Sequence, residues 1–209
     1  MILTIRCVCH NCVMDILLQR NAKGRLFVIS GPSGVGKDTL IDRLISQTDG
    51  IMRSVSATTR SPRMNEVNGR DYHFVTHAAF ARDIASNRFL EYEKYGENYY
   101  GTPVEPVQAN IEQGSDVILK IEVKGALNVR RLMPEARLIF IAPPSLTELE
   151  RRLRLRDTDS AAAVTNRMEI AKAELKQAMQ YDYVVINDVL DQALAQLACV
   201  ISAERVRIK

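Results

Sequence analysis

The stretch Gly31-Pro32-Ser33-Gly34-Val35-Gly36-Lys37-Asp38-Thr39 follows an apolar run, Leu26 to Ile29, and precedes an amphipathic segment that starts at Leu40. Its glycines can take positive φ and turn consecutive backbone N–H groups toward one point, where they can cradle polyphosphate oxygens. Lys37 can neutralise the β- and γ-phosphates. The helix that follows points its N-terminus at the same anion and adds partial positive charge. The strand, glycine-rich turn and helix therefore predict a P-loop.

Asp38 occupies the position at which serine or threonine usually follows the P-loop lysine. Two like unit charges about 4 Å apart interact by ~4 kcal/mol at an effective dielectric constant near 20, so a carboxylate facing a bare phosphate would be costly. We therefore expect Asp38 to turn away from the phosphates or to meet a cation. We expect Thr39 to supply the phosphate-facing hydroxyl and Asp38 to engage Mg²⁺ only through water, since this ion dehydrates reluctantly.

The composition predicts a soluble chain with a substantial core. Its 209 residues suffice for one domain, alone or with an inserted lobe, and 46% are hydrophobic. The net charge of +3, from 28 basic and 25 acidic residues, is too small to predict a nucleic-acid surface. No apolar run approaches the roughly twenty residues that span a bilayer, and residues 1–18 lack the pattern of a secretory signal. We expect a cytoplasmic protein without nucleic-acid or membrane partners.

Three cysteines and a histidine lie close together in Cys7-Val-Cys9-His10-Asn-Cys12. They could ligate a metal, but a structural zinc site usually needs two separated ligand pairs, and the sequence contains no second pair. Met14 would make a natural start shortly before the first strand. We therefore expect residues 1–24 to be an N-terminal extension, disordered or mis-started. Cys199 is expected to be a small buried hydrophobe.

The remaining pattern alternates strands with helices, which predicts an α/β fold with a parallel sheet. Strands are predicted at 51–56, 116–123, 137–142 and 183–186, and helices at 76–87, 103–113, 124–132, 161–180 and 189–207. The continuous apolar run at 137–142 is typical of a parallel strand covered on both faces, and 183–186 is expected to be a last buried strand, whereas 51–56 alternates like a half-exposed strand. Residues 89–102 predict a small β lobe that holds four of the seven tyrosines. Ligands of open α/β sheets lie beyond the carboxyl ends of the strands, so Glu122 is expected at the same edge as the P-loop.

The polar segment at residues 56–74 contains Arg60, Arg63 and Tyr72 on short connections, and Pro62 excludes a helix there. A guanidinium group can bind phosphate oxygens bidentately, and a phenol can add one more hydrogen bond. This residue set suits the dianionic end of a monophosphate. From the residues alone, a solvated loop with ordinary surface arginines is an equal alternative.

A second basic segment lies in a helical context with few local acidic partners. It contains Arg151, Arg152, Arg154, Arg156 and Arg167. A helix surface laced with salt bridges would explain some of this charge. Because the segment follows a phosphate-binding loop, we favour a lid that closes positive charge over transferring phosphates. In the helix predicted at 161–180, apolar residues at helical spacing, Met179 among them, are expected to face the core.

From about Leu26 to the C-terminus, the chain resembles the guanylate kinase family. The matching segments occur in family order: Gly-Pro-Ser-Gly-Val-Gly-Lys at 31–37, Ser-Ala-Thr-Thr-Arg-Ser-Pro-Arg at 56–63, Glu-Val-Asn-Gly-Arg-Asp-Tyr at 66–72, Asn-Tyr-Tyr-Gly-Thr at 98–102 and Val-Ile-Asn-Asp at 185–188. The resemblance implies a P-loop parallel sheet core flanked by helices (25–55, 103–145 and 170–207), a small inserted β-rich GMP-binding lobe (56–102) and a helical lid (146–169). It also implies transfer of the γ-phosphate of Mg-ATP to GMP, and to dGMP.

The resemblance implies roles for individual residues. For catalysis they are Lys37, Arg63, Arg152, Arg156 and Arg167. For ATP they are Gly31, Pro32, Ser33, Gly34, Val35, Gly36, Lys37, Asp38, Thr39 and Asn187, and for GMP they are Ser56, Arg60, Arg63, Tyr72, Glu91, Tyr100, Thr102 and Glu122. Ser56, Glu91 and Thr102 would read guanine. The Glu91 carboxylate can accept from both N1–H and the exocyclic N2 amino group, a pair of donors that adenine lacks.

The chain departs from the family pattern at four further positions. The family often has aspartate in place of Lys120, glutamine in place of Lys124, and glycines in place of Leu155 and Asp157. These changes concern metal handling and lid flexibility. Two other functions stay open: a ribose 1,5-bisphosphate phosphokinase, whose P-loop also carries aspartate after the lysine, and a non-catalytic guanylate-kinase-like domain that binds proteins. The guanine-reading residues argue against the first, and the retained Lys37 and arginines argue against the second.

Deleting residues 1–13 is predicted to leave folding and catalysis intact, because the extension precedes the first core strand and contains no residue of the family motifs. Thermal unfolding and turnover of the full and truncated chains test this. A large loss of thermal stability, or stoichiometric zinc that disappears on truncation, would contradict it.

Overall fold

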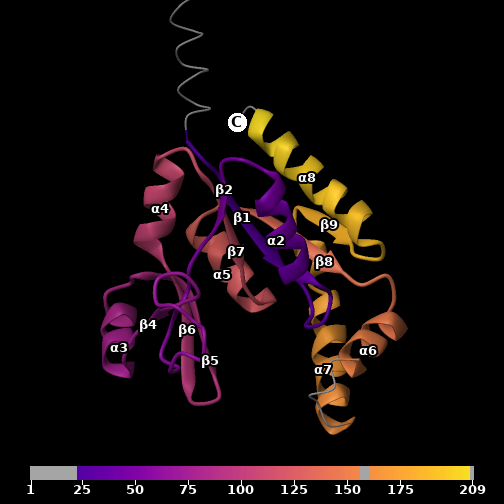
Figure 1. Ribbon diagram of the computed structural model, residues 1–209, viewed down its shortest axis with the longest axis horizontal. Helices are drawn as coiled ribbons and strands as arrows, with labels where there is room; N and C mark the ends of the chain where they lie inside the picture. Colours follow the sequence, from indigo (N-terminus) through magenta and orange to yellow (C-terminus); the bar gives the residue numbers. More distant parts are fainter. Residues whose placement is uncertain (1–22, 156–160, 208–209) are drawn as a thin grey trace, which may run out of the picture.

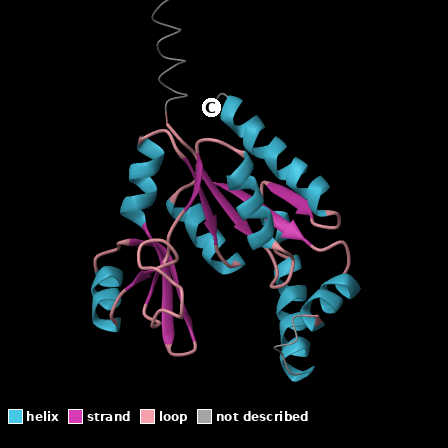
Figure 2. Ribbon diagram, viewed as in Figure 1, coloured by secondary structure: helices cyan, strands magenta, loops and turns pink. Residues whose placement is uncertain are grey.

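The computed structural model describes residues 23–155 and 161–207, and its main sheet is flanked by helices on both faces (Figures 1 and 2). A second, smaller sheet lies beside one end of the first. The elements in chain order are β1 (Leu26–Ser30), α2 (Lys37–Gln47), β2 (Ile51–Arg53), β3 (Ala57–Thr58), β4 (His73–Phe74), α3 (His77–Ala85), β5 (Phe89–Tyr95), β6 (Asn98–Pro103), α4 (Val104–Glu112), β7 (Asp116–Lys120), α5 (Val123–Leu132), β8 (Arg137–Ala142), α6 (Leu146–Arg154), α7 (Ala161–Leu175), the 3₁₀ helix η1 (Ala178–Gln180), β9 (Tyr183–Ile186) and α8 (Leu190–Val206).

The main sheet has the strand order β2-β7-β1-β8-β9, and all its described pairings are parallel. Side chains of β1 alternate between two cores. Phe27 and Ile29 pack with residues of α2 and α8, whereas Leu26 and Val28 pack with residues of α4 and α5. The predicted α/β fold, a parallel sheet core flanked by helices, is confirmed. Parallel pairing also brings the carboxyl ends of β1, β7, β8 and β9 to one edge, which is where the P-loop begins.

The second sheet has the order β4-β3-β6-β5 and carries α3. Its core is small and aromatic: Phe80 stacks on Phe89 with ring centroids 4.4 Å apart and on Tyr99 at 5.4 Å. The β5–β6 hairpin pairs Glu91 with Thr102 across the strands. This pairing fixes the relative positions of two residues that the sequence assigned to one base-reading set.

A buried carboxylate ties the amino-terminal edge of the main sheet together. Asp116, 3% exposed, accepts a hydrogen bond from the backbone N–H of Arg25 (2.7 Å) and another from Nε of Arg205 (2.7 Å). Arg205 also donates to the carbonyl oxygen of Asp49 (2.9 Å). These contacts join β7 and α8 to the residue that precedes β1, at the edge of the sheet opposite the P-loop.

Three local predictions are wrong. The helix predicted at 161–180 ends at Leu175 and a 3₁₀ turn follows, so Met179 is 92% exposed and does not face the core. The strand at 183–186, expected to be buried, lies at the edge of the sheet and is covered on one face only. Val184 and Ile186 point to the same face and are half exposed, whereas Val185 points to the other face and is buried in the main core. Cys199 lies on the exposed side of α8 and is not buried. Among the helices that the structure describes, none is long and apolar enough to cross a membrane.

Gly24→Ala is predicted to destabilise the fold without touching the carboxyl edge of the main sheet. A Cβ at Gly24 would lie 1.9 Å from the carbonyl oxygen of Ser115, and the Gly24 N–H donates to Ile111 O (2.8 Å), so the backbone would have to move. Overpacking of this kind costs about 1–3 kcal/mol. Chemical denaturation measures the loss, with Ser115→Ala, which keeps the carbonyl group, as control. Equal stability of Gly24→Ala and the wild type would contradict the packing described.

Candidate active site

The P-loop turns through three glycines in the left-handed region of φ: Gly31 at 142°, Gly34 at 89° and Gly36 at 88°. Two of them are also sterically required. A Cβ at Gly31 would lie 2.1 Å from the carbonyl oxygen of Ile141, and one at Gly36 would lie 2.6 Å from Nδ2 of Asn187. The loop is therefore pressed against the carboxyl ends of the neighbouring strands, with no room for side chains on that side.

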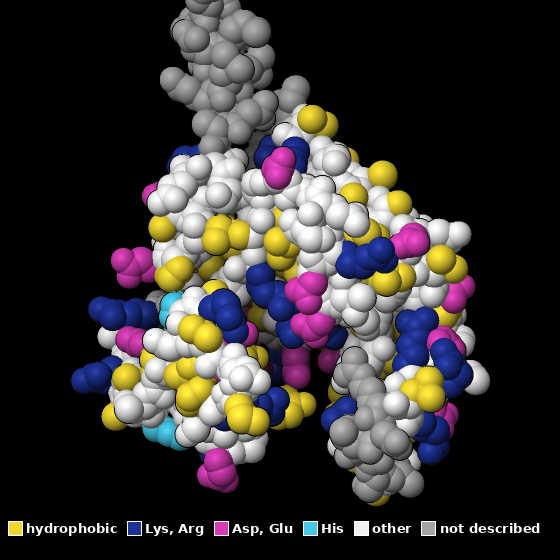
Figure 3. All heavy atoms as spheres, in the orientation of Figure 1, with side chains coloured by type: hydrophobic (Ala, Val, Ile, Leu, Met, Phe, Trp, Pro, Cys, Tyr) yellow, Lys and Arg dark blue, Asp and Glu magenta, His cyan; other side chains and the backbone are white. Residues whose placement is uncertain are grey.

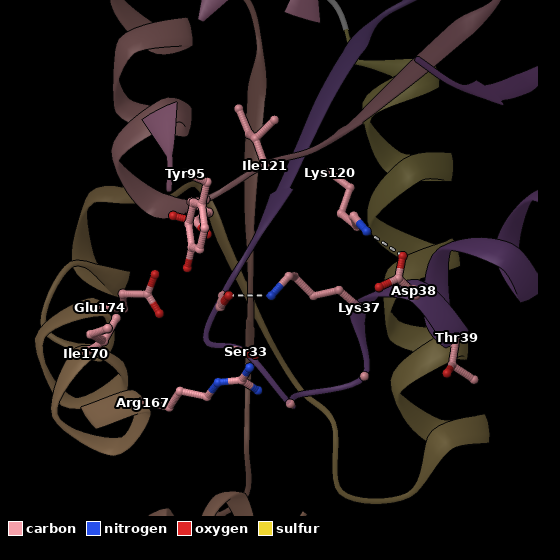
Figure 4. Close-up of a pocket in the computed structure, with 14 residues that line it drawn as sticks. Ser33, Lys37, Asp38, Thr39, Tyr95, Lys120, Ile121, Arg167, Ile170 and Glu174 are labelled. Carbon is pink, nitrogen blue, oxygen red and sulfur yellow. Dashed lines mark hydrogen bonds and ion pairs between the residues drawn. The ribbon is translucent and has the colours of Figure 1, made fainter. Parts of the chain in front are cut away.

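Lys37 is folded back into this loop. Its ammonium donates hydrogen bonds to the carbonyl oxygens of Gly31 (2.5 Å) and Pro32 (2.9 Å) (Figure 4). Burial lowers the pKa of Lys37 to about 8; the carboxylate of Glu174 opposes this shift, and the ammonium of Lys120 adds to it. An anion placed in the loop would favour the charged form and raise this pKa again. The geometry thus presents a desolvated cation to an incoming anion.

Asn187, the residue after β9, binds the backbone of the P-loop. It is 5% exposed, and its Nδ2 donates to the carbonyl oxygen of Val35 (2.7 Å). Val35 itself is fully buried in the main core, and the Asn187 carbonyl accepts from Nη1 of Arg152 (2.9 Å). Neither Val35 nor Asn187 lines the cavity in front of the loop. In the described structure both residues support the loop rather than face that cavity.

A cavity of about 370 Å³ opens in front of the P-loop (Figure 4). Its walls come from the loop, the carboxyl end of β7, the tip of β5 and one face of α7. The residues are Gly31, Ser33, Gly34, Gly36, Lys37, Asp38, Thr39, Tyr95, Lys120, Ile121, Glu122, Arg167, Ile170 and Glu174. Figure 3 shows the surface hollowed between the lobe of β3–β6 and the helices α6 and α7, with acidic and basic side chains gathered there.

A second cavity, of about 260 Å³, adjoins the first on the side of the small lobe. It is lined by Ser56, Tyr72, Glu91, Glu93, Tyr95, Tyr100, Gly101, Lys120, Ile121 and Glu122. Glu91 is 9% exposed, and its Oε1 accepts a hydrogen bond from Oγ1 of Thr102 (2.6 Å). Burial raises the pKa of Glu91, and the Thr102 hydroxyl opposes that shift. The result is a buried, oriented carboxylate that faces a cavity.

The expected phosphate-binding arginines of the small lobe lie in different settings. Arg60 donates bidentately to Glu66 (2.9 Å to each oxygen), and its guanidinium lies 5.5 Å from the ring centroid of Tyr72. Arg63 is exposed, and its backbone N–H donates to the same carboxylate (2.7 Å). Hydrogen bonds from Arg60 and from the Arg63 backbone lower the pKa of Glu66 to about 2. Glu66 therefore holds the loop and the Arg60 guanidinium together beside Tyr72 and Tyr100.

The basic segment of α6 and α7 has more acidic partners than we expected. Glu148 accepts from both Arg151 and Arg152, and Glu150 accepts from Arg154. The expectation of few local partners is wrong, because helical spacing of three or four residues places these side chains next to one another. Arg167 does line the first cavity, on the same face of α7 as Glu174, and points toward the P-loop (Figure 4). Arg156 and Asp157 lie outside the described residues.

Asp38 meets cations, one of the two outcomes expected. Its Oδ1 accepts from Nζ of Lys120 (2.6 Å) and from Nη2 of Arg53 (3.1 Å). Burial alone would raise the pKa of Asp38, but Lys120 and Arg53 hold it below its usual value. Thr39 lines the same cavity from the first turn of α2. The carboxylate after the P-loop lysine is therefore neutralised by the protein itself.

Sequence reasoning assigned no role to several cavity-lining residues, among them Tyr95 and Glu174. Burial raises the pKa of Glu174, and its carboxylate partly opposes the lowering of the Lys37 pKa. The spacing from Arg167 to Glu174 is seven residues, which places both on one face of a helix, so this signal was present in the sequence. Tyr95 was noted only as one of four tyrosines in the small lobe, because its place at the junction of the cavities depends on how the β5–β6 hairpin lies against the main sheet.

Comparison with known proteins assigns this geometry to a family. The family model described as guanylate kinase matches residues 23–204. The chain belongs to the guanylate kinase family. Its resemblance to that family, stated from the motifs, is confirmed.

Guanylate kinases of known sequence and structure align over most of the chain. That of Synechocystis sp. is 48% identical over 186 residues, which cover 89% of this chain and 97% of that protein. That of Bacillus subtilis is also 48% identical, covering 88% and 91%. The crystal structure of guanylate kinase from Anaplasma phagocytophilum superposes with a TM-score of 0.71 at 30% identity, covering 89% of this chain and 88% of that one. The guanylate kinase fold therefore extends over both cavities described above.

Proposed function

We propose that this protein transfers the γ-phosphoryl group of ATP to GMP, and to dGMP, to give ADP and the nucleoside diphosphate. One observation carries the proposal. The P-loop cavity and the small-lobe cavity share four lining residues: Tyr95, Lys120, Ile121 and Glu122. Two nucleotides, one in each cavity, would bring their phosphates together over these residues. Such juxtaposition is what phosphoryl transfer between nucleotides requires.

Glu91 is suited to read guanine. Its ionised carboxylate can accept hydrogen bonds from N1–H and the N2 amino group of the base, and the Thr102 hydroxyl holds one oxygen in place. Ser56 lines the same cavity. A buried site built around paired hydrogen bonds rejects a base that cannot complete them, because its own polar groups are then left without partners.

The acceptor phosphate would lie between the base-reading residues and the shared wall. Tyr72 and Tyr100 line that cavity with their rings 6.0 Å apart, and Arg60 lies beside Tyr72. Arg60 is paired with Glu66, so a phosphate would have to share or replace this carboxylate. Arg63, exposed beside it, would supply a second guanidinium without breaking an ion pair of its own side chain in the described structure.

The reaction needs no covalent intermediate on the protein. An oxygen of the GMP phosphate attacks the γ-phosphorus of ATP, the bond from that phosphorus to the β-bridging oxygen breaks, and ADP leaves with the electron pair. Lys37 would neutralise charge on the donor phosphates, and Arg167 would act from α7 opposite. Arg152 lines neither cavity and is held by Glu148 and by the carbonyl oxygen of Asn187, so it would have to leave these partners to reach a phosphate. Positioning and charge neutralisation account for the catalysis.

The residues present fit Mg²⁺ that arrives with ATP. Among the described residues no group of three or more metal-ligating side chains forms a closed metal site. The oxygen-bearing groups of Thr39, Asp38 and Glu122 nevertheless line the P-loop cavity, and Mg²⁺ is usually held by one or two carboxylates together with substrate phosphates and water. Thr39 and Glu122 would hold it, with Asp38 acting through water. Bound there, Mg²⁺ would supply charge neutralisation to the β- and γ-phosphates.

Turnover with different acceptors tests the proposal. In a coupled assay of ADP release with Mg-ATP, GMP and dGMP are expected to be phosphorylated, with kcat/KM values far above that for AMP. Ribose 1,5-bisphosphate is the second control. Preferential turnover of that compound would identify a ribose bisphosphate phosphokinase, and no turnover with any acceptor would favour a protein-binding domain. Either result would overturn the proposal.

Thr102→Val is predicted to lower kcat/KM for GMP. The change removes the hydroxyl that donates to Glu91, and with it a hydrogen bond to a charged group worth about 1.5–3 kcal/mol. Since that hydrogen bond also opposes the raised pKa of Glu91, the carboxylate should protonate at higher pH in the variant. GMP binding needs the ionised carboxylate. As the pH is lowered, the variant should therefore lose its affinity for GMP at a higher pH than the wild type does.

Thr102→Ser keeps the hydroxyl donor and serves as the matched control for Thr102→Val. Glu91→Gln removes the charge, so it should lower kcat/KM for GMP far more than it changes the Kd for ATP. The measurements are kcat/KM for GMP against pH and the Kd for ATP. An unchanged kcat/KM for GMP in Glu91→Gln would remove Glu91 from the base-reading role.

A further inference from the structure

Lys120 lies at the junction of the two cavities. It is the last residue of β7, paired in register with Ile29 of β1, so its side chain projects from the carboxyl edge of the sheet beside the P-loop. Of the four residues that line both cavities, Lys120 is the cation. Its side chain is 34% exposed, and Figure 4 shows it reaching toward Asp38, on the same side of the cavity as Lys37.

The Lys120 ammonium is held by a specific partner. Asp38, in the first turn of α2, accepts from Lys120 at 2.6 Å and from Arg53 at 3.1 Å, and Arg53 also lies 3.5 Å from Asp42. Both Asp38 and Lys120 depart from the family pattern, and in the structure these two departures contact each other. The added carboxylate and the added ammonium cancel in charge, while the ammonium is left on the wall that both cavities share.

This arrangement leaves the ammonium available to a stronger anion. Asp38 carries one negative charge that it shares with two cations, and a partly exposed ion pair contributes little net free energy. A phosphate of a bound nucleotide carries more charge and offers more acceptor oxygens. Lys120 can therefore turn from Asp38 to phosphate without leaving the Asp38 carboxylate unpaired, because Arg53 stays with Asp38.

We propose that Lys120 is a phosphate-binding residue of this reaction, acting where donor and acceptor phosphates meet, and that Asp38 is its positioning residue. The inference rests on the proposed transfer from ATP to GMP. Lys120 adds positive charge to the transferring group from the acceptor side, whereas Lys37 acts from within the P-loop. Asp38, the residue after the P-loop lysine, then contributes to catalysis by positioning Lys120.

Lys120→Met, which keeps the length of the side chain and removes its charge, tests the first part. We expect kcat/KM for GMP at saturating Mg-ATP to fall roughly ten- to hundredfold, because one charge-assisted contact to the transferring phosphoryl group is lost. Lys172→Met is the matched control: Lys172 pairs with Glu169 at 2.7 Å on the exposed side of α7 and lines neither cavity. Its kcat/KM should equal that of the wild type.

A binding measurement separates this inference from the proposed function. The Kd of a compound that joins adenosine and guanosine through a polyphosphate chain should rise more in Lys120→Met than the Kd of ADP or of GMP alone. If the wild-type protein fails to phosphorylate GMP, the proposed function fails whatever Lys120 does. If the wild type turns over GMP and Lys120→Met matches it in both kcat/KM and affinity for the joined compound, the inference on Lys120 is overturned.

Two further variants distinguish positioning from a structural ion pair. Asp38→Asn should lower kcat/KM several-fold in the wild-type background and add nothing in the Lys120→Met background. The exchange Asp38→Lys with Lys120→Asp restores the pair and should recover the melting temperature but not the activity. Recovery of activity in the exchanged protein would show that the pair acts only in stability. Additive effects of the two single changes on kcat/KM would show that Asp38 does not act through Lys120, and either result would overturn the role of Asp38 proposed here.

Discussion

The packing of the P-loop backbone against the carboxyl ends of the strands is the constraint on which the site depends. Gly31 approaches the backbone of β8 too closely for any Cβ, and Gly36 approaches Asn187 in the same way. Asn187 in turn bonds to the loop at Val35 and follows the last strand of the sheet. The P-loop backbone, which follows β1, is therefore held against the carboxyl ends of β8 and β9. We propose that the backbone N–H groups of this loop form the anion site, and the parallel strand order brings the carboxyl ends of β1, β7, β8 and β9 to the same edge.

Charge balance across the two cavities follows from this packing. Burial lowers the pKa of Lys37 and raises the pKa values of Glu91, Glu122 and Glu174, so it disfavours the charged form of each group. Polyphosphate favours the charged form of Lys37, and two guanine donors favour the charged form of Glu91. Binding of the substrates thus relieves electrostatic costs that the fold imposes. The ion pair of Asp38 with Lys120 belongs to the same balance.

Much of this site could be predicted because it depends on local backbone chemistry. Glycine spacing, an apolar strand before and an amphipathic helix after were enough to place the P-loop, and motif order was enough to place the small lobe. Contacts between distant segments were beyond such reasoning. Lys120 and Asp38 are 82 residues apart, and only the parallel pairing of β7 with β1 brings them together. The pairs of Glu148 with Arg151 and Arg152 follow from helical spacing of three and four residues, so the sequence did contain the signal for them.

The measurement that tests the central claim most directly compares the binding of GMP with that of IMP, whose base keeps N1–H and lacks the N2 amino group. If Glu91 accepts from both guanine donors, IMP forfeits one hydrogen bond to a buried charge, worth about 1.5–3 kcal/mol, and should bind roughly ten- to hundredfold more weakly. The difference should shrink in Glu91→Gln. Equal Kd values for GMP and IMP in the wild-type protein would contradict the account of the site as a reader of guanine.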